Sequence, residues 1–231
     1  MGKLSVIATP IGNLEDITLR ALRTLKECDV IYAEDTRVIS KLLARYEFKK
    51  PLQRLDAVTE IKKAEEIISR LEAGENVAFV SDAGTPGISD PGARLVSHIR
   101  KQMPSVKIEA IPGPSALTSA LSISGIDATE FTFIGFLPHK KGRQTALKKI
   151  AAMVRQDSPH GKMTVVLYES PHRILKLLKE FEELNVIKIT IARELTKIHE
   201  EVISGNAKEL QEYFTVHPDA VCGEFVVIVE P

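Results

Sequence analysis

Short apolar runs alternate with amphipathic stretches along the first half of the chain. The runs at residues 4–8, 30–33, 77–80 and 106–111 have the length and composition of buried strands. Between them, apolar residues recur at helical spacing, which predicts helices at 19–25, 38–46, 64–71, 91–101 and 115–124. Asp16 stands where the first helix needs an N-cap, and Gly74 where the third helix would end. This alternation indicates βαβ units and a mainly parallel sheet.

The pattern restarts after residues 124–129, which form the best candidate for a linker. Strands are predicted at 131–136, 163–168 and 188–192, with helices at 144–154 and 174–184. Two further short runs, 201–204 and 224–229, flank a helix at 207–214, and their closeness favours antiparallel pairing. The sequence therefore predicts an α/β fold with two domains, residues 1–123 and 124–231. The first would contain a mainly parallel sheet with helices on both faces, and the second a mixed sheet.

Polar loops that contain Gly, Pro or charged residues follow the predicted strands. In the first domain they are residues 9–13, 34–37, 81–92 and 112–116, and in the second 137–143, 169–173 and 193–197. In open parallel sheets, ligands bind beyond the carboxyl ends of the strands. The loops are therefore expected to meet at one edge of each sheet and to line a ligand cleft between the two domains.

The loop at residues 81–92 is the most unusual of these segments. Any single strand-to-helix turn needs Gly, Pro, Asp and Ser in any case, so ordinary turn chemistry explains most of the loops. This one holds three Gly, two Pro and two Asp in twelve residues, more than a tight turn requires. Gly84, Gly87 and Gly92 permit backbone conformations closed to other residues and let a ligand approach the main chain. Its composition favours a binding loop.

The charge balance argues against a protein that coats nucleic acid by bulk electrostatics. The 231 residues include 31 basic and 31 acidic side chains, so the formal net charge is zero. A local basic patch stays open, and one cluster comprises Lys140, Lys141, Arg143, Lys148 and Lys149. Such a cluster is more commonly the solvated start of a helix. The functional alternative is a patch that contacts phosphates.

Several other chemistries have no support in the sequence. Neither G-x-x-x-x-G-K-[S/T] nor a G-x-G-x-x-G after the first strand is present, so the usual phosphate cradles are not expected. The six histidines have no metal-ligand spacing, and we expect no metal. Cys28 and Cys222 lie far apart, which favours a reduced, cytoplasmic setting. No apolar run approaches the ~20 residues that span a bilayer, and no signal peptide is evident, so no membrane partner is expected.

Residues 34–37 place two acids and an arginine directly after the second predicted strand. A helix N-cap formed by Asp35 or Thr36 explains this pattern well, because an acid is favourable at the positive end of the helix dipole. A role in catalysis is the alternative. Spacing alone favours the cap.

At these loops the chain resembles the tetrapyrrole methylase superfamily and, within it, the ribosomal RNA small-subunit methyltransferase I family. The resemblance runs from Leu4 to Pro231, and the combination of its segments is specific although single pieces are not. The matching segments are residues 8–17, 33–37, 81–92, 112–116, 168–173, 192–197, 200–201 and 223–226. Resemblance implies S-adenosylmethionine-dependent 2′-O-methylation of a cytidine ribose in 16S rRNA of the small ribosomal subunit. It also implies a homodimer with the cofactor in the cleft between the two domains.

The resemblance further implies which residues bind the cofactor, mostly through the main chain. They are Pro10, Ile11, Gly12, Asp82, Ala83, Gly84, Thr85, Pro86, Ser115, Ala116, Tyr168, Ser170, Ala192 and Arg193. For RNA contacts we expect Lys140, Lys141, Arg143 and Arg173.

A 2′-O-methyl transfer must also manage one proton, and Glu34 or Asp35 is the candidate general base. Arg37 would then place a phosphate or order the loop.

Two departures from the family and two rival functions remain. Residues 55–60 replace a stretch that usually contains His and Asn, and the sequence ends at Pro231 without the further domain that many relatives carry. One rival is a methyltransferase of the same superfamily that acts on a small tetrapyrrole. The other is a non-catalytic module that binds the cofactor or the ribosome.

Overall fold

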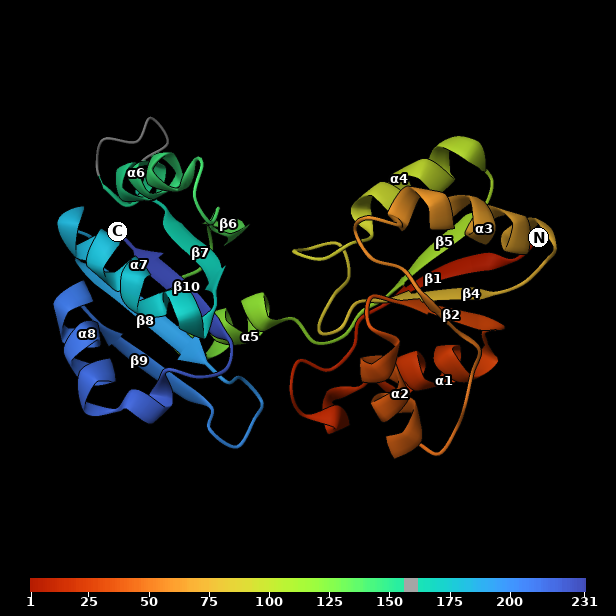
Figure 1. Cartoon of the computed structure of the whole chain (residues 1–231), viewed down its shortest axis with the longest axis horizontal. Coiled ribbons are helices and arrows are strands. Elements are labelled where there is room, and N and C mark those ends of the chain that lie inside the picture. Colours follow the sequence, from red (N-terminus) through yellow and green to blue (C-terminus); the bar gives the residue numbers. More distant parts are fainter. Residues whose placement is uncertain (156–161) are drawn as a thin grey trace. The chain divides into compact units, whose positions relative to one another are not determined.

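The computed structural model describes residues 1–155 and 162–231 (Figure 1). The chain divides into two compact units, Met1–Ser115 and Ala116–Pro231, which we call unit 1 and unit 2. The boundary expected after residue 123 falls at the C-terminal end of helix α5 (Ala116–Ser124), and the structure assigns that helix to unit 2. Within the described residues, no helix is long and apolar enough to cross a membrane.

Unit 1 is built on a parallel sheet of five strands, counted over the described part of the chain, in the order β3-β2-β4-β1-β5. The prediction of a mainly parallel sheet is confirmed. Each predicted strand is present to within a residue at either end. The additional strand, β3, is short, only partly buried and at the sheet edge. The strands are β1 (Lys3–Ile7), β2 (Val30–Ala33), β3 (Leu52–Arg54), β4 (Val77–Val80) and β5 (Lys107–Ile111).

Helices cover both faces of this sheet, as the sequence predicts (Figure 1). Helices α1 (Leu19–Glu27) and α2 (Thr36–Arg45) pack on one face, against strand residues such as Ile7 and Ile31. Helices α3 (Glu60–Glu72) and α4 (Ala93–Gln102) pack on the other, around Tyr32 and Phe79. Because both faces are buried, β2 and β4 contain only buried residues, which is why they appear in the sequence as uninterrupted apolar runs.

The start of α3 and the cap of α1 in unit 1 differ clearly from expectation. The N-cap of α1 is Thr18, whose side chain accepts a hydrogen bond from Ala21 N, so the expectation of Asp16 is wrong. Asp16 instead ends a short 3-10 helix (Leu14–Asp16) capped by Asn13. Helix α3 begins at Glu60, four residues before the predicted start. By contrast, Asp35 caps α2 by accepting from Arg37 N at 2.8 Å, as the simpler interpretation of residues 34–37 expects.

Unit 2 contains a mixed sheet of five strands within the described residues, in the order β6-β7-β10-β8-β9. Its strands are β6 (Phe131–Phe136), β7 (Thr164–Glu169), β8 (Lys188–Arg193), β9 (Glu201–Gly205) and β10 (Phe225–Glu230). Strands β6 and β7 are parallel, whereas β10 is antiparallel to both β7 and β8, and β9 is antiparallel to β8. The last two strands are thus in antiparallel pairs, as predicted, but each pairs with β8 and not with the other.

The helices of unit 2 also lie on two faces. One apolar cluster joins α6 (Arg143–Val154), α7 (Pro171–Glu183) and α8 (Ala207–Val216) to one face of the sheet. Helix α5 packs against β8 and β10, and Leu117 N at its start donates a hydrogen bond of 3.2 Å to Oη of Tyr168. Because the carboxyl ends of β6, β7 and β8 point the same way, the loops after these strands share one edge of the sheet.

Gly92 gives a test of this packing. Its φ is +131°, and a Cβ atom there would lie 2.6 Å from Cε1 of the buried Phe79. We expect Gly92→Ala to lower the free energy of unfolding by about 3 kcal/mol through backbone strain plus overpacking. Gly74 is the matched control, because its φ is +92° but no atom lies within 4 Å of a Cβ there, so Gly74→Ala should cost about 1 kcal/mol. Urea titration followed by circular dichroism measures both, and equal losses would contradict the packing argument.

Candidate active site at the strand ends of unit 1

Hydrogen bonds hold the loops after β1 and β4 together at the carboxyl edge of the unit 1 sheet. Thr9 and Gly84 exchange two main-chain hydrogen bonds, of 2.9 Å from Thr9 N and 3.0 Å from Gly84 N. The Thr9 hydroxyl also donates to the carbonyl oxygen of Ser81 at 3.3 Å. The glycine-rich loop at residues 81–92 is therefore fixed at its start to the loop that follows the first strand.

Two further hydrogen bonds bring in the other strand-end loops. Asp35 N, after β2, donates to Oδ1 of Asp82 at 2.8 Å. The hydroxyl of Thr85 donates to the carbonyl oxygen of Pro114, after β5, at 3.2 Å. All four loops of the first half thus meet at one edge, where the sequence places them, and residues 81–92 contact each of the others.

Gly84 lies at the centre of this arrangement. Its φ is +76°, and a Cβ atom there would lie 3.4 Å from Cγ2 of Ile11 and 3.7 Å from the carbonyl oxygen of Pro114. Gly84 itself is buried, and its missing side chain lets the backbones of these loops approach one another closely. A hollow of about 50 Å³ lies beside it, where Thr9, Pro10, Ser81 and Asp82 face α2. By itself this hollow holds a small group rather than a whole cofactor, since such ligands occupy roughly 300–1,000 Å³.

The edge gathers several acids, and only some of them have a cation as partner, namely Asp35 with Arg37 and Asp56 with Arg54. Burial raises the pKa of Glu34, and the neighbouring charges of Asp82, Asp90 and Asp56 raise it further, whereas Arg54 opposes them. Burial likewise raises the pKa of Asp90, Asp82 adds to this, and a hydrogen bond with Ser81 opposes it. Both shifts record first the cost of ionising a buried carboxylate and then the cost of placing it beside other acids. The edge therefore favours a proton or a cationic ligand.

Asp35 differs from Glu34, although the two are neighbours. The side chain of Arg37 donates to both carboxylate oxygens of Asp35, with Nε 3.0 Å from each, and Arg37 N donates to Oδ1. These hydrogen bonds lower the pKa of Asp35 to about 2. Of the two candidate bases, Glu34 is therefore the one whose carboxylate takes up a proton more readily. The side chain of Arg37 is 86% exposed even though it binds Asp35.

A buried carboxylate that sequence inspection did not select closes the far end of the glycine-rich loop. Glu60 is 3% exposed and accepts hydrogen bonds from Gly92 N at 2.9 Å and Leu95 N at 2.8 Å. It therefore binds the otherwise unpaired amides at the start of α4. Residues 55–60 were conspicuous only as a departure from the family pattern, and no local signal connects Glu60 to a helix more than 30 residues later.

In unit 2, Arg143 corrects the expectation of an RNA contact. Its side chain is only 4% exposed, and its guanidinium donates to Glu180, with Nη2 2.7 Å from Oε2, and lies 3.5 Å from Glu169. A guanidinium paired with two buried carboxylates is not available to a phosphate. Arg143 instead joins the loop after β6 to α7. Lys140 and Lys141, on the same loop, are exposed.

The other selected residues of unit 2 lie along the same edge of the sheet. Arg173 donates to the carbonyl oxygen of Leu137 at 2.9 Å and lies 2.6 Å from Oε1 of Glu169. Ser170 caps the start of α7. Ala192 is fully buried, and Arg193 donates to Glu201 at 2.7 Å.

Tyr168 is half-buried and packs edge-on against two aromatic rings. Its ring centroid lies 4.9 Å from that of Phe133 and 5.5 Å from that of Phe136. Ser115, the last residue of unit 1, and Ala116, the first of unit 2, are half-buried. Among the described residues, no group of three or more His, Cys, Asp or Glu could hold a metal ion; His160 lies outside them.

Comparison with known proteins gives a consistent result. The family model of Tetrapyrrole (Corrin/Porphyrin) Methylases matches residues 3–211. The chain is 44% identical to the ribosomal RNA small subunit methyltransferase I of Thermotoga maritima, over 93% of this chain and 92% of the relative. It is also 44% identical to the protein of that name from Borrelia garinii subsp. bavariensis, over 98% and 97% of the two chains.

Among solved structures, the methyltransferase CobJ is similar with a TM-score of 0.71. The alignment covers 100% of this chain and 94% of that one at 19% identity. At this identity the similarity speaks for the fold alone, and it extends over both units.

The burial of Glu34 and Asp90, together with the repulsion among the acids, predicts a gain in stability when they are neutralised. A carboxyl whose pKa is raised on folding loses stability as the pH rises from its unfolded pKa through its folded pKa. We therefore expect Glu34→Gln and Asp90→Asn each to raise the melting temperature at pH 7, but not at about pH 3.5, where the native acids are mostly protonated.

Asp127→Asn is the control of opposite sign, because Thr129 lowers the pKa of Asp127 through two hydrogen bonds. That variant should lower the melting temperature at pH 7. Thermal denaturation at both pH values measures all three, and a loss of stability in the first two variants at pH 7 would refute the repulsion.

Proposed function

Because the chain belongs to the tetrapyrrole methylase family and, within it, to the ribosomal RNA small subunit methyltransferase I family, we propose that it methylates 16S rRNA. The donor is S-adenosylmethionine, and the acceptor is the ribose 2′-oxygen of a cytidine in the small ribosomal subunit. The observation that carries this proposal is the 44% identity to two relatives of that name over 92% and 97% of their lengths. We also propose, from the family resemblance, a homodimer that works in the cytoplasm.

The strand-end loops of unit 1 fit the cofactor in two respects. Gly12 and Gly113 are exposed on the loops after β1 and β5, so main chain is accessible there to a ligand that is bound mostly by the backbone. The clustered carboxylates near Asp82 suit a ligand with positive charge. S-adenosylmethionine, when bound, supplies a methyl group activated by a positive sulfonium. Its proposed contacts in unit 1 are Pro10, Ile11, Gly12, Asp82, Ala83, Gly84, Thr85, Pro86 and Ser115.

The contacts proposed from unit 2 are Ala116, Tyr168, Ser170, Ala192 and Arg193. Ala192 is fully buried, so only its main chain is suited to such a contact. The guanidinium of Arg193 binds Glu201 and is therefore better placed to order β8 than to bind a ligand directly.

Glu34 is the residue that we propose to accept the proton of the ribose hydroxyl. Its raised pKa brings it closer to the working pH, which makes it a more effective base than an ordinary exposed carboxylate. Asp35 then orders the loop through Arg37, whose exposed guanidinium is available to place a phosphate. A base of this kind contributes roughly 10²–10⁴-fold to the rate. Correct orientation of the acceptor oxygen contributes up to about 7–11 kcal/mol.

For the RNA, Lys140 and Lys141 are the contacts that we retain from unit 2. Both are exposed on the loop after β6. Arg173 holds this loop through Leu137 and Glu169, so we propose that it positions the lysines. Charged contacts to phosphate strengthen binding without reading sequence.

The rival functions predict different acceptors in a methyl-transfer assay. The purified protein is offered labelled S-adenosylmethionine with unmodified small ribosomal subunits, naked 16S rRNA or a tetrapyrrole. We expect label in the subunits, on a ribose 2′-oxygen, because the relatives at 44% identity carry the rRNA name. Label in the tetrapyrrole alone would replace the proposed substrate. Label in none of the three, with cofactor bound, would favour a non-catalytic module.

Variants of the two acids test the assignment of the base. We expect Glu34→Gln to lower kcat by about 10²–10⁴-fold, a larger loss than that in cofactor affinity, because the amide cannot accept the proton. The loss in Asp35→Asn should be smaller and should include a weaker KM for RNA, since that change loosens Arg37. Single-turnover transfer and calorimetric cofactor titration separate the effects. Near-normal turnover in both variants would exclude this pair as the source of the base.

A further inference from the structure

Helix α2 carries a row of cations along one side. Arg37, Lys41 and Arg45 follow each other at intervals of four residues, which places them on one helical face with about 6 Å of rise between neighbours. Helix α2 contains no acidic residue, and Lys49 continues the row just after the helix. We call Arg37, Lys41, Arg45 and Lys49 the α2 cation row.

The row is only partly neutralised. Arg37 binds Asp35, and Arg45 lies 3.8 Å from Glu15. Lys41 and Lys49 are exposed and form no ion pair within residues 1–155 and 162–231. In a chain whose formal net charge is zero, this is a local excess of positive charge. It lies on unit 1, whereas the basic cluster around Lys140 that the sequence indicates belongs to unit 2.

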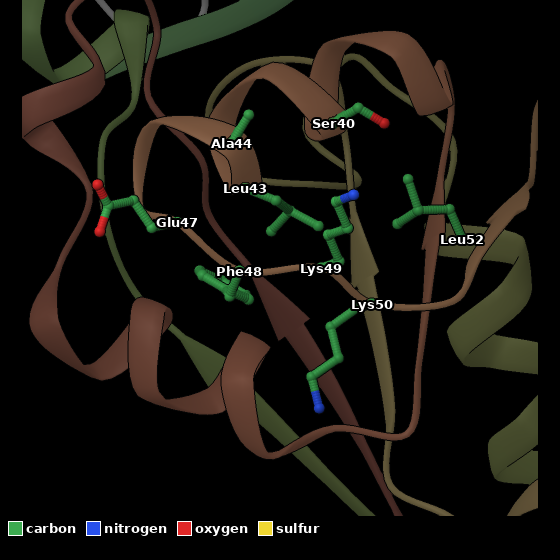
Figure 2. Close-up of a pocket in the computed structure, with 8 residues that line it drawn as sticks. All are labelled: Ser40, Leu43, Ala44, Glu47, Phe48, Lys49, Lys50 and Leu52. Atoms are coloured by element: carbon green, nitrogen blue, oxygen red, sulfur yellow. The ribbon is translucent and has the colours of Figure 1, made fainter.

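A pocket lies beside the second half of the row (Figure 2). Its volume is about 690 Å³, within the range of roughly 300–1,000 Å³ that small-molecule sites occupy. Leu43, Ala44, Phe48 and Leu52 give it an apolar lining. Its polar lining comprises the hydroxyl of Ser40, the carboxylate of Glu47 and the amino groups of Lys49 and Lys50, so two cations there face one acid. In Figure 2 the amino group of Lys49 points toward Ser40 and Leu43.

Lys50 holds the wall of this pocket instead of facing the row. In Figure 2 it points away from Lys49, and its Nζ donates to the carbonyl oxygen of Cys28 at 2.6 Å. Lys26 lies 5.2 Å from the centroid of the Phe48 ring and packs against it as a cation on an aromatic face. Both contacts tie the segment after α2 to the end of α1, so the pocket is built by ordered residues.

We propose that the α2 cation row and its pocket form a second contact for the RNA strand, with phosphates along the row and one unstacked nucleotide in the pocket. The inference rests on the proposed function and extends it to a named surface. Sequence-tolerant RNA contacts combine cations that follow the backbone with apolar side chains against which bases pack. Arg37 lies three residues after Glu34, at the start of α2, so a strand bound along the row leads from the pocket to the proposed base.

Charge favours RNA over the other occupants. In a two-fold dimer through this face, the same surface of both copies would be in contact. The two cation rows would then lie close together and repel each other. A single free nucleotide would engage the pocket and Lys49 but leave the part of the row from Arg37 to Arg45, about 12 Å of helix, without a partner.

The test removes the two unpaired charges of the row. We expect Lys41→Gln combined with Lys49→Gln to weaken binding of 16S rRNA about tenfold at moderate salt. The dependence of log affinity on log salt should become shallower by about 1.4–1.8, or 0.7–0.9 for each lost phosphate contact. Lys62→Gln combined with Lys101→Gln is the matched control, because it removes the same charge from exposed lysines on α3 and α4. Cofactor affinity, measured by calorimetry, should stay unchanged in both double variants.

A second variant tests the pocket without changing the charge. Ala44→Phe fills it from an exposed helical position, and we expect weaker RNA binding with an unchanged salt slope. Ala73→Phe, at an exposed position after α3, is the control and should bind RNA normally.

The outcomes separate this surface from the proposed function. If the native protein transfers label to RNA but the Lys41/Lys49 variant keeps the slope of its control, the row is not an RNA contact and the function stands. If Ala44→Phe changed the oligomeric state of the protein in solution, the pocket would be an interface between copies of the chain. Binding of CMP alone, lost in Ala44→Phe while RNA affinity is unchanged, would make it a nucleotide site. Either result overturns the inference. If the native protein transfers label to none of the acceptors, the proposed function is overturned, and the inference that rests on it is overturned too.

Discussion

The two main-chain hydrogen bonds between Thr9 and Gly84 are the contact on which the candidate site depends. They join the loops after β1 and β4, two adjacent strands of a parallel sheet, at the one edge where all such loops must end. Once these loops are joined, Asp82 reaches Asp35 and Thr85 reaches Pro114. Pairing of this kind requires Gly84 to lie in a conformation that side chains disfavour, so the need for a glycine follows from the backbone.

Electrostatics divides the surface of unit 1 into two parts. Around Asp82 the carboxylates outnumber the cations, and their raised pKa values record the cost. Along α2 the cations outnumber the acids. Arg37 and Asp35 lie where the two parts meet and neutralise each other. A methyl donor with a positive centre and an acceptor with negative phosphates would each meet a surface of opposite charge, although the formal net charge of the whole chain is zero.

The sequence predicted most of the fold because most strands are buried on both faces. Continuous apolar runs such as those of β2 and β4 are unambiguous when helices cover both sides of a sheet. Strand β3 was missed because it is an edge strand of three residues, with only Leu52 apolar. The cap of α1 was assigned wrongly because Asp16 and Thr18 are both good caps, and the preceding 3-10 helix decides between them.

The site was predictable to the extent that it depends on strand order. Loops at the carboxyl ends of parallel strands must converge, so their meeting follows from the fold class. The partners of individual charged side chains could not be predicted from the sequence. Arg143 belongs to a basic run in sequence, but its carboxylate partners, Glu169 and Glu180, lie 26 and 37 residues away. Glu60 was missed for the same reason, because its role depends on amides that are distant in sequence.

The hydrogen bonds of Glu60 have a consequence for how unit 1 opens. A buried carboxylate at the start of α3 caps the start of α4, so neither helix end can fray without exposing unsatisfied groups of the other. The two helices and the glycine-rich loop between them should therefore behave as one cooperative unit in hydrogen exchange. Ordering of that loop should slow the exchange of the Gly92 and Leu95 amides together. It should also slow exchange at the start of α3, although α3 comes before the loop in the chain.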